Sequence, residues 1–285
     1  MIGLEFSLEP IQRHRDFYAK FIVGIEGSSN ERLIAAFSRV ERERFLPPGP
    51  WHVQVGKNYV PTISSDPRLV YQDMLIGLDI SRRINNGQPS LHACCISACD
   101  PQRGESVVHV GAGMGYYTAV LTEMVGDQPP VIAYEIDENL AAAARNNLAH
   151  LENVTVRNAS GANNNFPQAD IVYVSAGATH PLDVWLDALS IGGRLLFPLT
   201  AGHGFGCMLL ITRVAPESYA TRIIVRAGFI PCIGARDEEL VQALSRALDT
   251  NALREVRSLR RIGQPNDTAW FVGKGWWLSS EASGN

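Results

Sequence analysis

The chain has 285 residues, of which 46% are hydrophobic and 19% are charged, so it can bury a sizeable core and is not expected to be disordered. Its formal net charge of −4 argues against broad, nonspecific binding to nucleic acid. The five cysteines are an odd number without a C-x-x-C pair, which argues against a disulfide framework or a structural zinc site. The sequence has no signal-like N-terminus and no apolar segment of roughly 20 residues, so we expect a soluble, cytoplasmic protein.

The first third of the chain is predicted to form helices followed by a loop-rich segment. Apolar residues at helical spacing predict a helix over residues 9–26 and a second over residues 30–44, with Asn30 as its N-cap. Residues 51–86 carry few periodic apolar positions and are expected to wrap the core. A helix at about 90–98 then leads into the first core strand.

Strands and helices alternate along the middle of the chain. We expect strands at 106–110, 131–135, 153–157, 170–175, 194–199, 206–214 and 220–227, and helices at 118–125, 138–150 and 181–189. This order predicts an α/β fold, a Rossmann-like, doubly wound mixed sheet of seven strands with N-terminal helices and a C-terminal extension.

The pattern changes beyond Gly234 to an amphipathic helix at 237–248, followed by Arg-rich and Trp-rich segments. We therefore divide the chain into an N-terminal helical and loop-rich cap (1–86), a core (87–234) and a C-terminal appended module (235–285). The tryptophans of this module are expected mainly to cap a core surface. A homo-oligomer formed through the module is a further possibility.

The most informative motif follows the first core strand. Gly111, Gly113 and Gly115 alternate where a parallel strand turns into a helix, a turn that needs φ > 0 and a backbone that a ligand can approach closely. The next strand ends in Glu135, whose carboxylate can accept hydrogen bonds from both ribose hydroxyls of a nucleoside. The G-x-G-x-G spacing is one residue shorter than the dinucleotide pattern and is the spacing used by S-adenosylmethionine-dependent methyltransferases.

Several segments resemble protein-L-isoaspartate O-methyltransferases, over roughly residues 30 to 234. The similar segments are Ala36–Pro47, Tyr71-Gln72-Asp73, Gln88-Pro89, Gly192–Pro198 and Gly228–Pro231. The resemblance implies the class I methyltransferase fold, S-adenosylmethionine as cofactor and no metal.

The resemblance also implies which residues form the site. The expected cofactor-binding residues are His109, Gly111, Gly113, Gly115, Tyr116, Glu135, Ile136, Ser160, Gly161 and Ser175, and the expected acceptor-side residues are Gly87, Gln88 and Pro89.

Three of these positions depart from the family pattern. Gly87 replaces a serine beside the methyl-accepting carboxylate, and His109 replaces an acid that helps to hold the cofactor's amino group. Ser160 replaces the aspartate of a Gly-Asp-Gly element that contacts the adenine amine. Because one charge-assisted hydrogen bond contributes ~1.5–3 kcal/mol, these changes are expected to weaken cofactor binding without abolishing it.

The acceptor decides whether a general base is needed. A carboxylate is already nucleophilic near neutral pH, whereas a hydroxyl or an amine needs a base poised near the operating pH. The base candidates are His92, His109 and His180, of which His92 is expected to be a core histidine. His180 follows the end of the fourth strand, where acceptor-facing residues are expected, and is the best catalytic candidate.

The leading hypothesis is therefore an S-adenosylmethionine-dependent methyltransferase that acts on a carboxylate or another oxygen of a peptide or small metabolite. One alternative is a canonical protein-L-isoaspartate O-methyltransferase. A second is a catalytically inactive protein of the same fold that acts as a binding or assembly partner through residues 235–285. A nicotinamide-dependent oxidoreductase is a third, which the glycine spacing disfavours.

Overall fold

The computed structural model describes residues 10–25, 27–163, 165–202, 204–249 and 255–284. These residues belong to two compact units, Met1–Cys94 and Cys95–Asn285. Residues 9 and 26, at the ends of the first predicted helix, lie outside the described ranges. The predicted division at residues 87 and 235 stays a prediction.

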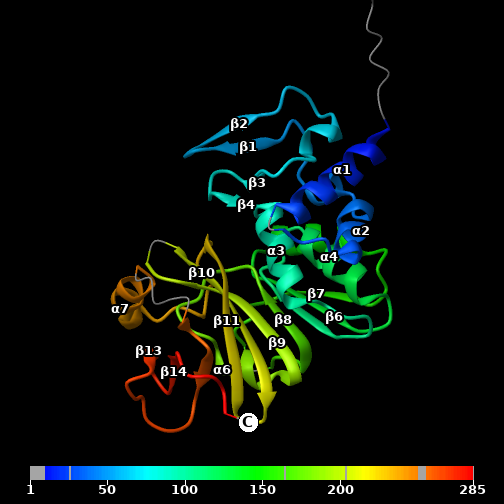
Figure 1. Cartoon of the computed structure of the whole chain (residues 1–285). Coiled ribbons are helices and arrows are strands. Elements are labelled where there is room, and N and C mark those ends of the chain that lie inside the picture. Colours follow the sequence, from blue (N-terminus) through cyan, green and yellow to red (C-terminus); the bar gives the residue numbers. More distant parts are fainter. Residues whose placement is uncertain (1–9, 26, 164, 203, 250–254, 285) are drawn as a thin grey trace, which may run out of the picture. The chain divides into compact units, whose positions relative to one another are not determined.

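The described residues of the first unit form two helices, two short 3-10 helices and two β-hairpins (Figure 1). Its elements are α1 (Ile11–Gly24), α2 (Glu31–Arg39), η1 (Arg42–Phe45), β1 (His52–Val55), β2 (Asn58–Pro61), η2 (Pro67–Val70), β3 (Gly77–Asp79) and β4 (Ile84–Asn85), and α3 (Pro89–Cys99) begins in it. The strands pair antiparallel, β1 with β2 and β3 with β4, so the segment predicted to be loop-rich carries two hairpins. Tyr18 is wholly buried in this unit and makes edge contacts with Phe37 and Tyr71.

Helix α2 begins as predicted, because the Asn30 side chain accepts a hydrogen bond from the Leu33 backbone N–H at 3.1 Å. The prediction that this helix continues to residue 44 is wrong, since it ends at Arg39. The backbone N–H of Arg42 donates instead to the Tyr71 hydroxyl at 3.2 Å, and its buried guanidinium donates to three backbone carbonyls of residues 70–74. These long-range hydrogen bonds replace the local helical ones.

The second unit is built on one ten-stranded sheet with helices packed against it (Figure 1). Its elements are β5 (Val107–Val110), α4 (Tyr116–Val125), β6 (Val131–Glu135), α5 (Glu138–Leu148), β7 (Val154–Asn158), β8 (Ala169–Val174), α6 (Asp183–Asp187), β9 (Leu189–Thr200), β10 (Phe205–Ala215), β11 (Ser218–Gly228), α7 (Glu238–Leu248), β12 (Ser258–Arg260), β13 (Ala269–Gly273) and β14 (Trp276–Ser279). The strand order is β13-β14-β12-β11-β10-β9-β8-β5-β6-β7.

The predicted mixed sheet of seven strands is confirmed as the run from β7 to β11. Strands β5 to β9 pair parallel, and β10 pairs antiparallel with both β9 and β11. Three strands from the C-terminal region continue the sheet, because Tyr219 of β11 pairs with Leu259 of β12, which in turn pairs with Leu278 of β14. The Arg-rich and Trp-rich segments therefore add strands to the core sheet.

One helix of the core is shorter than predicted and the strand after it is longer. Helix α6 covers only Asp183–Asp187, and β9 begins at Leu189 rather than at residue 194. Leu189 pairs with Ala169 of β8, which draws the segment into the sheet. Gly193 makes this possible, because a Cβ there would lie 2.8 Å from the Ser190 carbonyl oxygen.

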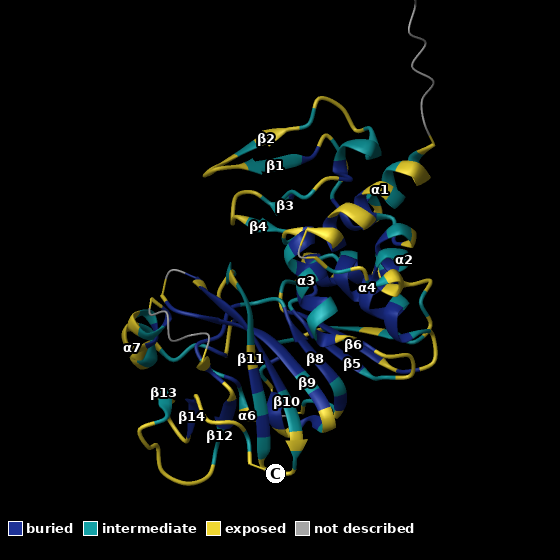
Figure 2. Ribbon diagram, viewed as in Figure 1, coloured by how far each residue is buried: buried dark blue, intermediate teal, exposed yellow. Residues whose placement is uncertain are grey.

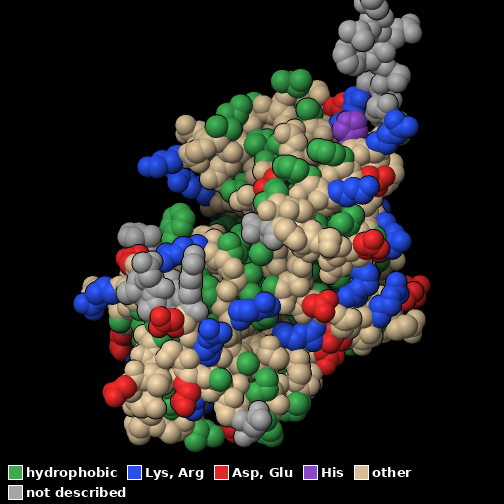
Figure 3. Space-filling view, in the orientation of Figure 1, with side chains coloured by type: hydrophobic (Ala, Val, Ile, Leu, Met, Phe, Trp, Pro, Cys, Tyr) green, Lys and Arg blue, Asp and Glu red, His purple; other side chains and the backbone are tan. Residues whose placement is uncertain are grey.

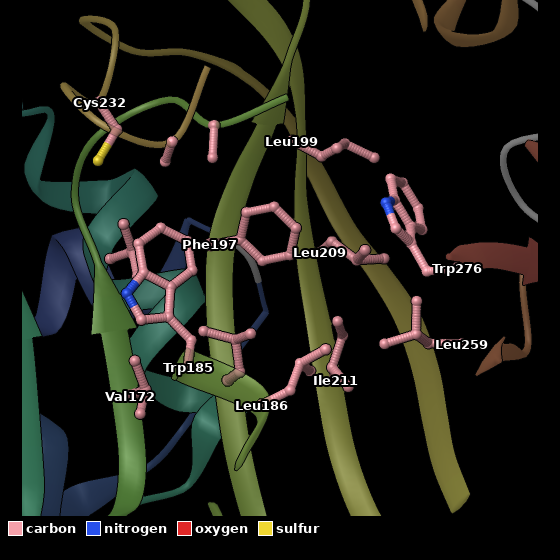
Figure 4. Packing of buried hydrophobic residues seen from close by; sticks show 14 of the residues in the cluster. Val172, Trp185, Leu186, Phe197, Leu199, Leu209, Ile211, Cys232, Leu259 and Trp276 are labelled. Atoms are coloured by element: carbon pink, nitrogen blue, oxygen red, sulfur yellow. The ribbon is translucent and has the colours of Figure 1, made fainter. Parts of the chain in front are cut away.

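A large apolar cluster forms part of the interior of the second unit, and the ribbons of β8, β9 and β10 are mostly buried (Figure 2). Figure 4 shows Trp185 facing Phe197, whose ring centroid lies 6.1 Å away. Trp276 of β14 is 7% exposed and belongs to the same cluster, so one tryptophan of the C-terminal region packs against the core as expected. The C-terminal strands are thereby joined to the core by packing as well as by backbone pairing.

Basic and acidic side chains are interspersed on the face drawn in Figure 3. Within the described ranges, no helix is long and apolar enough to cross a membrane. All five cysteines are free. No group of three His, Cys, Asp or Glu side chains among the described residues is placed to hold a metal ion.

Candidate cofactor and active site

The glycine turn lies between β5 and α4, as the sequence predicts. Gly111, Gly113 and Gly115 have φ values of +79°, +57° and +97°, in the left-handed region that favours glycine. The Tyr134 carbonyl of β6 accepts hydrogen bonds from the backbone N–H groups of Gly111 and Ala112, at 2.9 and 3.1 Å. These two bonds hold the turn against the carboxyl end of the neighbouring strand.

Glu135 faces this turn. Its Oε2 accepts a hydrogen bond from the Gly113 backbone N–H at 2.8 Å, and its Oε1 accepts one from the Asp137 N–H at 3.0 Å. Burial raises the pKa of the Glu135 carboxyl, and the two backbone hydrogen bonds oppose that rise. Each carboxylate oxygen keeps acceptor capacity for a ligand hydroxyl. The adjacent Ile136 is 46% exposed and offers an apolar surface beside the carboxylate.

Ser160 and Gly161 follow β7 and close against the same strand end. A Cβ on Gly161 would lie 2.6 Å from both methyl groups of Val110, so only glycine fits there. The Gly161 carbonyl accepts a hydrogen bond from Trp185 Nε1 at 2.7 Å. The Ser160 hydroxyl donates to the Ile233 carbonyl at 3.3 Å. The loop is thus held by the core on one side and by the segment after β11 on the other.

His109 is buried on β5 and is 1% exposed. Its Nδ1 lies 2.8 Å from Thr118 Oγ1 of α4, and its Nε2 lies 3.0 Å from Ser175 Oγ at the end of β8. Burial lowers the pKa of His109 to about 3, so the imidazole is neutral at physiological pH. Tyr116, at the start of α4, is also buried and packs its ring 5.0 Å from that of Tyr117. Their roles in cofactor binding stay predictions.

His180 is half-buried just beyond β8. Its Nδ1 lies 3.0 Å from Thr179 Oγ1, which accepts a hydrogen bond from the Asp237 backbone N–H at 2.8 Å. Burial lowers the pKa of His180, while the nearby carboxylates of Asp237 and Asp183 oppose that shift. The side chain is therefore available as a neutral hydrogen-bonding group.

The expected acceptor-side residues lie in the first unit, where two of the family-like segments meet. Gln88 Nε2 donates to Asp73 Oδ2 at 2.9 Å, and the same carboxylate accepts from the backbone N–H and the hydroxyl of Ser90 at 2.8 and 2.7 Å. Gly87 has a φ of +74°, and its N–H donates to Asn85 Oδ1 at 3.0 Å. The role of Asp73 in holding the start of α3 was not foreseen, although the Tyr71-Gln72-Asp73 resemblance had marked the segment.

Replacing Gly87 by serine is expected to lower the free energy of unfolding by ~1–2 kcal/mol, because a side chain at φ +74° is strained. Chemical denaturation measures this loss. Gly284→Ser, in the exposed C-terminal tail, is the control and is expected to leave stability unchanged. Equal stability of Gly87→Ser and the unmodified protein would contradict the left-handed backbone at this residue.

Arg236 was also not foreseen by sequence reasoning. Its guanidinium donates to the Thr200 carbonyl at 2.9 Å, to Thr200 Oγ1 at 3.0 Å and to the Ala201 carbonyl at 3.1 Å, at the end of β9. Its charge lowers the pKa of His180. In the part of the chain that the structure describes, Arg236 forms no ion pair, and its buried Nε has no hydrogen-bond partner. Nothing in the local sequence pattern marks an arginine without a carboxylate partner.

The fold and the glycine turn define a class I methyltransferase. A protein-L-isoaspartate O-methyltransferase structure has a TM-score of 0.61 at 22% identity, covering 81% of this chain and 69% of that chain. A Plasmodium falciparum protein described as a protein-L-isoaspartate O-methyltransferase, in complex with S-adenosyl-L-homocysteine, has a TM-score of 0.62 at 14% identity, covering 77% of this chain and 98% of that chain. These likenesses confirm the predicted fold.

The family model described as Protein-L-isoaspartate(D-aspartate) O-methyltransferase matches residues 25–237, and the chain belongs to that family. The protein-L-isoaspartate O-methyltransferase of Methanothermobacter thermautotrophicus is 28% identical over 209 residues, which are 72% of this chain and 88% of the relative. The protein-L-isoaspartate O-methyltransferase of Ignicoccus hospitalis is 29% identical over 213 residues, which are 73% of this chain and 92% of that relative.

Membership in this family confirms the predicted resemblance, the methyltransferase class and S-adenosylmethionine as the cofactor. The residues present fit such a cofactor. Gly113 has no side chain and a φ of +57°, and Glu135, which accepts a hydrogen bond from its backbone N–H, retains acceptor capacity. Which side chains touch the cofactor stays a prediction.

Proposed function

We propose that this methyltransferase transfers a methyl group from S-adenosylmethionine to a carboxylate on a peptide, in the cytoplasm. The observation that carries the proposal is the Glu135 carboxylate bonded to the Gly113 N–H at the glycine turn. Glu135 would bind the ribose hydroxyls, and Ile136 would pack against the adenine. The free state of all five cysteines supports a reducing compartment.

A carboxylate acceptor suits the groups at the carboxyl ends of β8 and β9, where His180 and Arg236 lie. The cofactor supplies a methyl group on a sulfonium, and an ionised carboxylate attacks it without first losing a proton. The protein then needs to orient the acceptor and exclude water rather than supply a strong base. The absence of an ion pair for Arg236 among the described residues supports an anionic acceptor, since a guanidinium binds a carboxylate well.

Isothermal titration with S-adenosylhomocysteine tests the cofactor proposal, and no measurable heat at millimolar ligand would refute it. Transfer of a labelled methyl group then tests the acceptor. Peptides with an isoaspartyl, an aspartyl or a C-terminal carboxylate should be compared with an amidated peptide that lacks all three. The expected product is an alkali-labile methyl ester. An alkali-stable product would refute a carboxylate acceptor.

Isoaspartate is the second candidate acceptor, and the names of the relatives favour it. Gly87 argues for a different acid, because it lacks the side chain that the family's serine supplies at this position. The peptide series separates the two. A rate on the isoaspartyl peptide far above the rates on all the others would establish the canonical activity.

Replacing His180 by glutamine is expected to raise the KM for the acceptor while changing kcat by less than about tenfold, because a carboxylate needs no base. The pH dependence of kcat should be the same in both proteins. Steady-state kinetics over the neutral range measure this. A loss of kcat of roughly 10²–10⁴-fold would instead assign His180 the role of general base.

Replacing Arg236 by glutamine is expected to raise the KM for an anionic acceptor by about tenfold or more, with little change in cofactor affinity. Arg213→Gln is the matched control, because Arg213 also donates to backbone carbonyls, those of Leu189 and Pro216. Equal effects of the two substitutions on the KM would show that Arg236 only stabilises the fold.

A further inference from the structure

His109 joins the hydroxyls of Thr118 and Ser175 through its two ring nitrogens, at 2.8 and 3.0 Å. A neutral imidazole carries one N–H and one lone pair, so one hydroxyl must donate to the ring and the other must accept from it. The imidazole stays neutral because burial holds its pKa near 3. The direction of the two hydrogen bonds therefore depends on the tautomer.

The surroundings of Thr118 decide that tautomer. Thr118 is completely buried on α4, and among the residues that the structure describes its Oγ1 bonds only to His109 Nδ1. If Nδ1 carried the proton, the Thr118 O–H would be buried without an acceptor, which is unfavourable. With the proton on Nε2, Thr118 donates to Nδ1 and both groups are satisfied.

The Nε2–H tautomer fixes the role of Ser175. Its Oγ then accepts from His109, and its own O–H is left to donate to another group. Ser175 is partly buried at the carboxyl end of β8, and its backbone lies against Gly111, where a Cβ would be 3.4 Å from the Ser175 carbonyl carbon. The free hydroxyl hydrogen is therefore placed beside the glycine turn.

We infer that Ser175 donates its hydroxyl hydrogen to the carboxylate of the cofactor's amino-acid part, and that His109 is the positioning residue that orients it. The inference rests on the proposed function, because it requires an adenosyl amino acid at the glycine turn. The carboxylate is chosen over the ammonium group because only the carboxylate can accept the hydrogen that Ser175 offers.

The test compares two ligands in isothermal titrations. One is S-adenosylhomocysteine, and the other is its decarboxylated analogue, which keeps the amine and lacks the carboxylate. Ser175→Ala is expected to weaken binding of S-adenosylhomocysteine by about ten- to a hundredfold and binding of the analogue by less than about threefold. Ser160→Ala is the control, because it lies on the opposite side of the proposed site and should affect both ligands by the same factor.

His109 is tested with two variants and one direct measurement. His109→Leu is expected to reproduce the ligand-selective loss of Ser175→Ala, whereas His109→Gln keeps an N–H donor toward Ser175 and should retain most of the affinity. Nitrogen NMR of the labelled imidazole reports the tautomer, with His109→Gln identifying its signals. If His109→Leu does not fold, the inference is still tested by the other measurements, which are the titrations of His109→Gln and Ser175→Ala and the NMR spectrum.

Two results would overturn this inference and leave the proposed function standing. One is an equal loss of affinity for both ligands in Ser175→Ala, and the other is a proton on Nδ1 of His109 in the unmodified protein. Failure of the unmodified protein to bind S-adenosylhomocysteine would overturn the proposed function and this inference together, so the two failures are distinguishable.

Discussion

Replacing Glu135 by glutamine is expected to weaken S-adenosylhomocysteine binding by about ten- to a hundredfold, because a neutral amide replaces the ionised acceptor proposed for the ribose hydroxyls. The substitution keeps the shape of the side chain. It also leaves either the Gly113 or the Asp137 N–H without a carboxylate oxygen, which loosens the turn. Isothermal titration measures the affinity, and circular dichroism confirms that the variant is folded.

The pH dependence of binding gives a second signature of Glu135. Burial raises the pKa of this carboxyl, so it takes up a proton at a higher pH than an ordinary glutamate. Because only the ionised form accepts from both hydroxyls, affinity should fall as the pH decreases through that raised pKa. The affinity of the Glu135→Gln variant should not show this fall with decreasing pH.

Glu138→Gln is the matched control, since Glu138 is an exposed glutamate in the first turn of α5. Its affinity is expected to stay within about threefold of the unmodified protein, with the same pH profile. Comparable losses in the Glu135 and Glu138 variants would contradict the assignment of the ribose to Glu135.

Replacing Trp185 by alanine is expected to lower the free energy of unfolding by ~3–5 kcal/mol, because Trp185 is fully buried and packs against Phe197. Trp185→Phe keeps a ring but removes the Nε1–H that bonds to the Gly161 carbonyl. That variant should lose ~1–3 kcal/mol and should also bind the cofactor more weakly, because the loop of Ser160 and Gly161 loses its anchor. Urea denaturation measures both losses.

Trp270→Ala controls for residue type, because Trp270 is only partly buried against the same cluster. Its loss of stability should be smaller than that of Trp185→Ala. If Trp185→Phe retains full stability and full cofactor affinity, the hydrogen bond to Gly161 does not hold the loop.

Local pattern was sufficient to predict the central part of this fold. Strand Val107–Val110, the three glycines with positive φ and the strand that ends at Glu135 were all predicted from neighbouring residues. Such features can be predicted from the sequence because a strand, a left-handed turn and the start of a helix each depend on a few consecutive side chains. The end of the second helix was misjudged, since it is set by the Tyr71 hydroxyl, 29 residues from Arg42.

The sequence by itself determined the order of the core elements from β5 to β11, the glycine turn and the acidic residue that faces it. Only the tertiary structure decided that Thr118 and Ser175 meet the two nitrogens of His109, and that Arg236 lies at the end of β9 without a described carboxylate partner. The physical reason is that these pairings join residues on different strands and helices. Their hydrogen bonds depend on how the whole sheet packs, and no local periodicity encodes them.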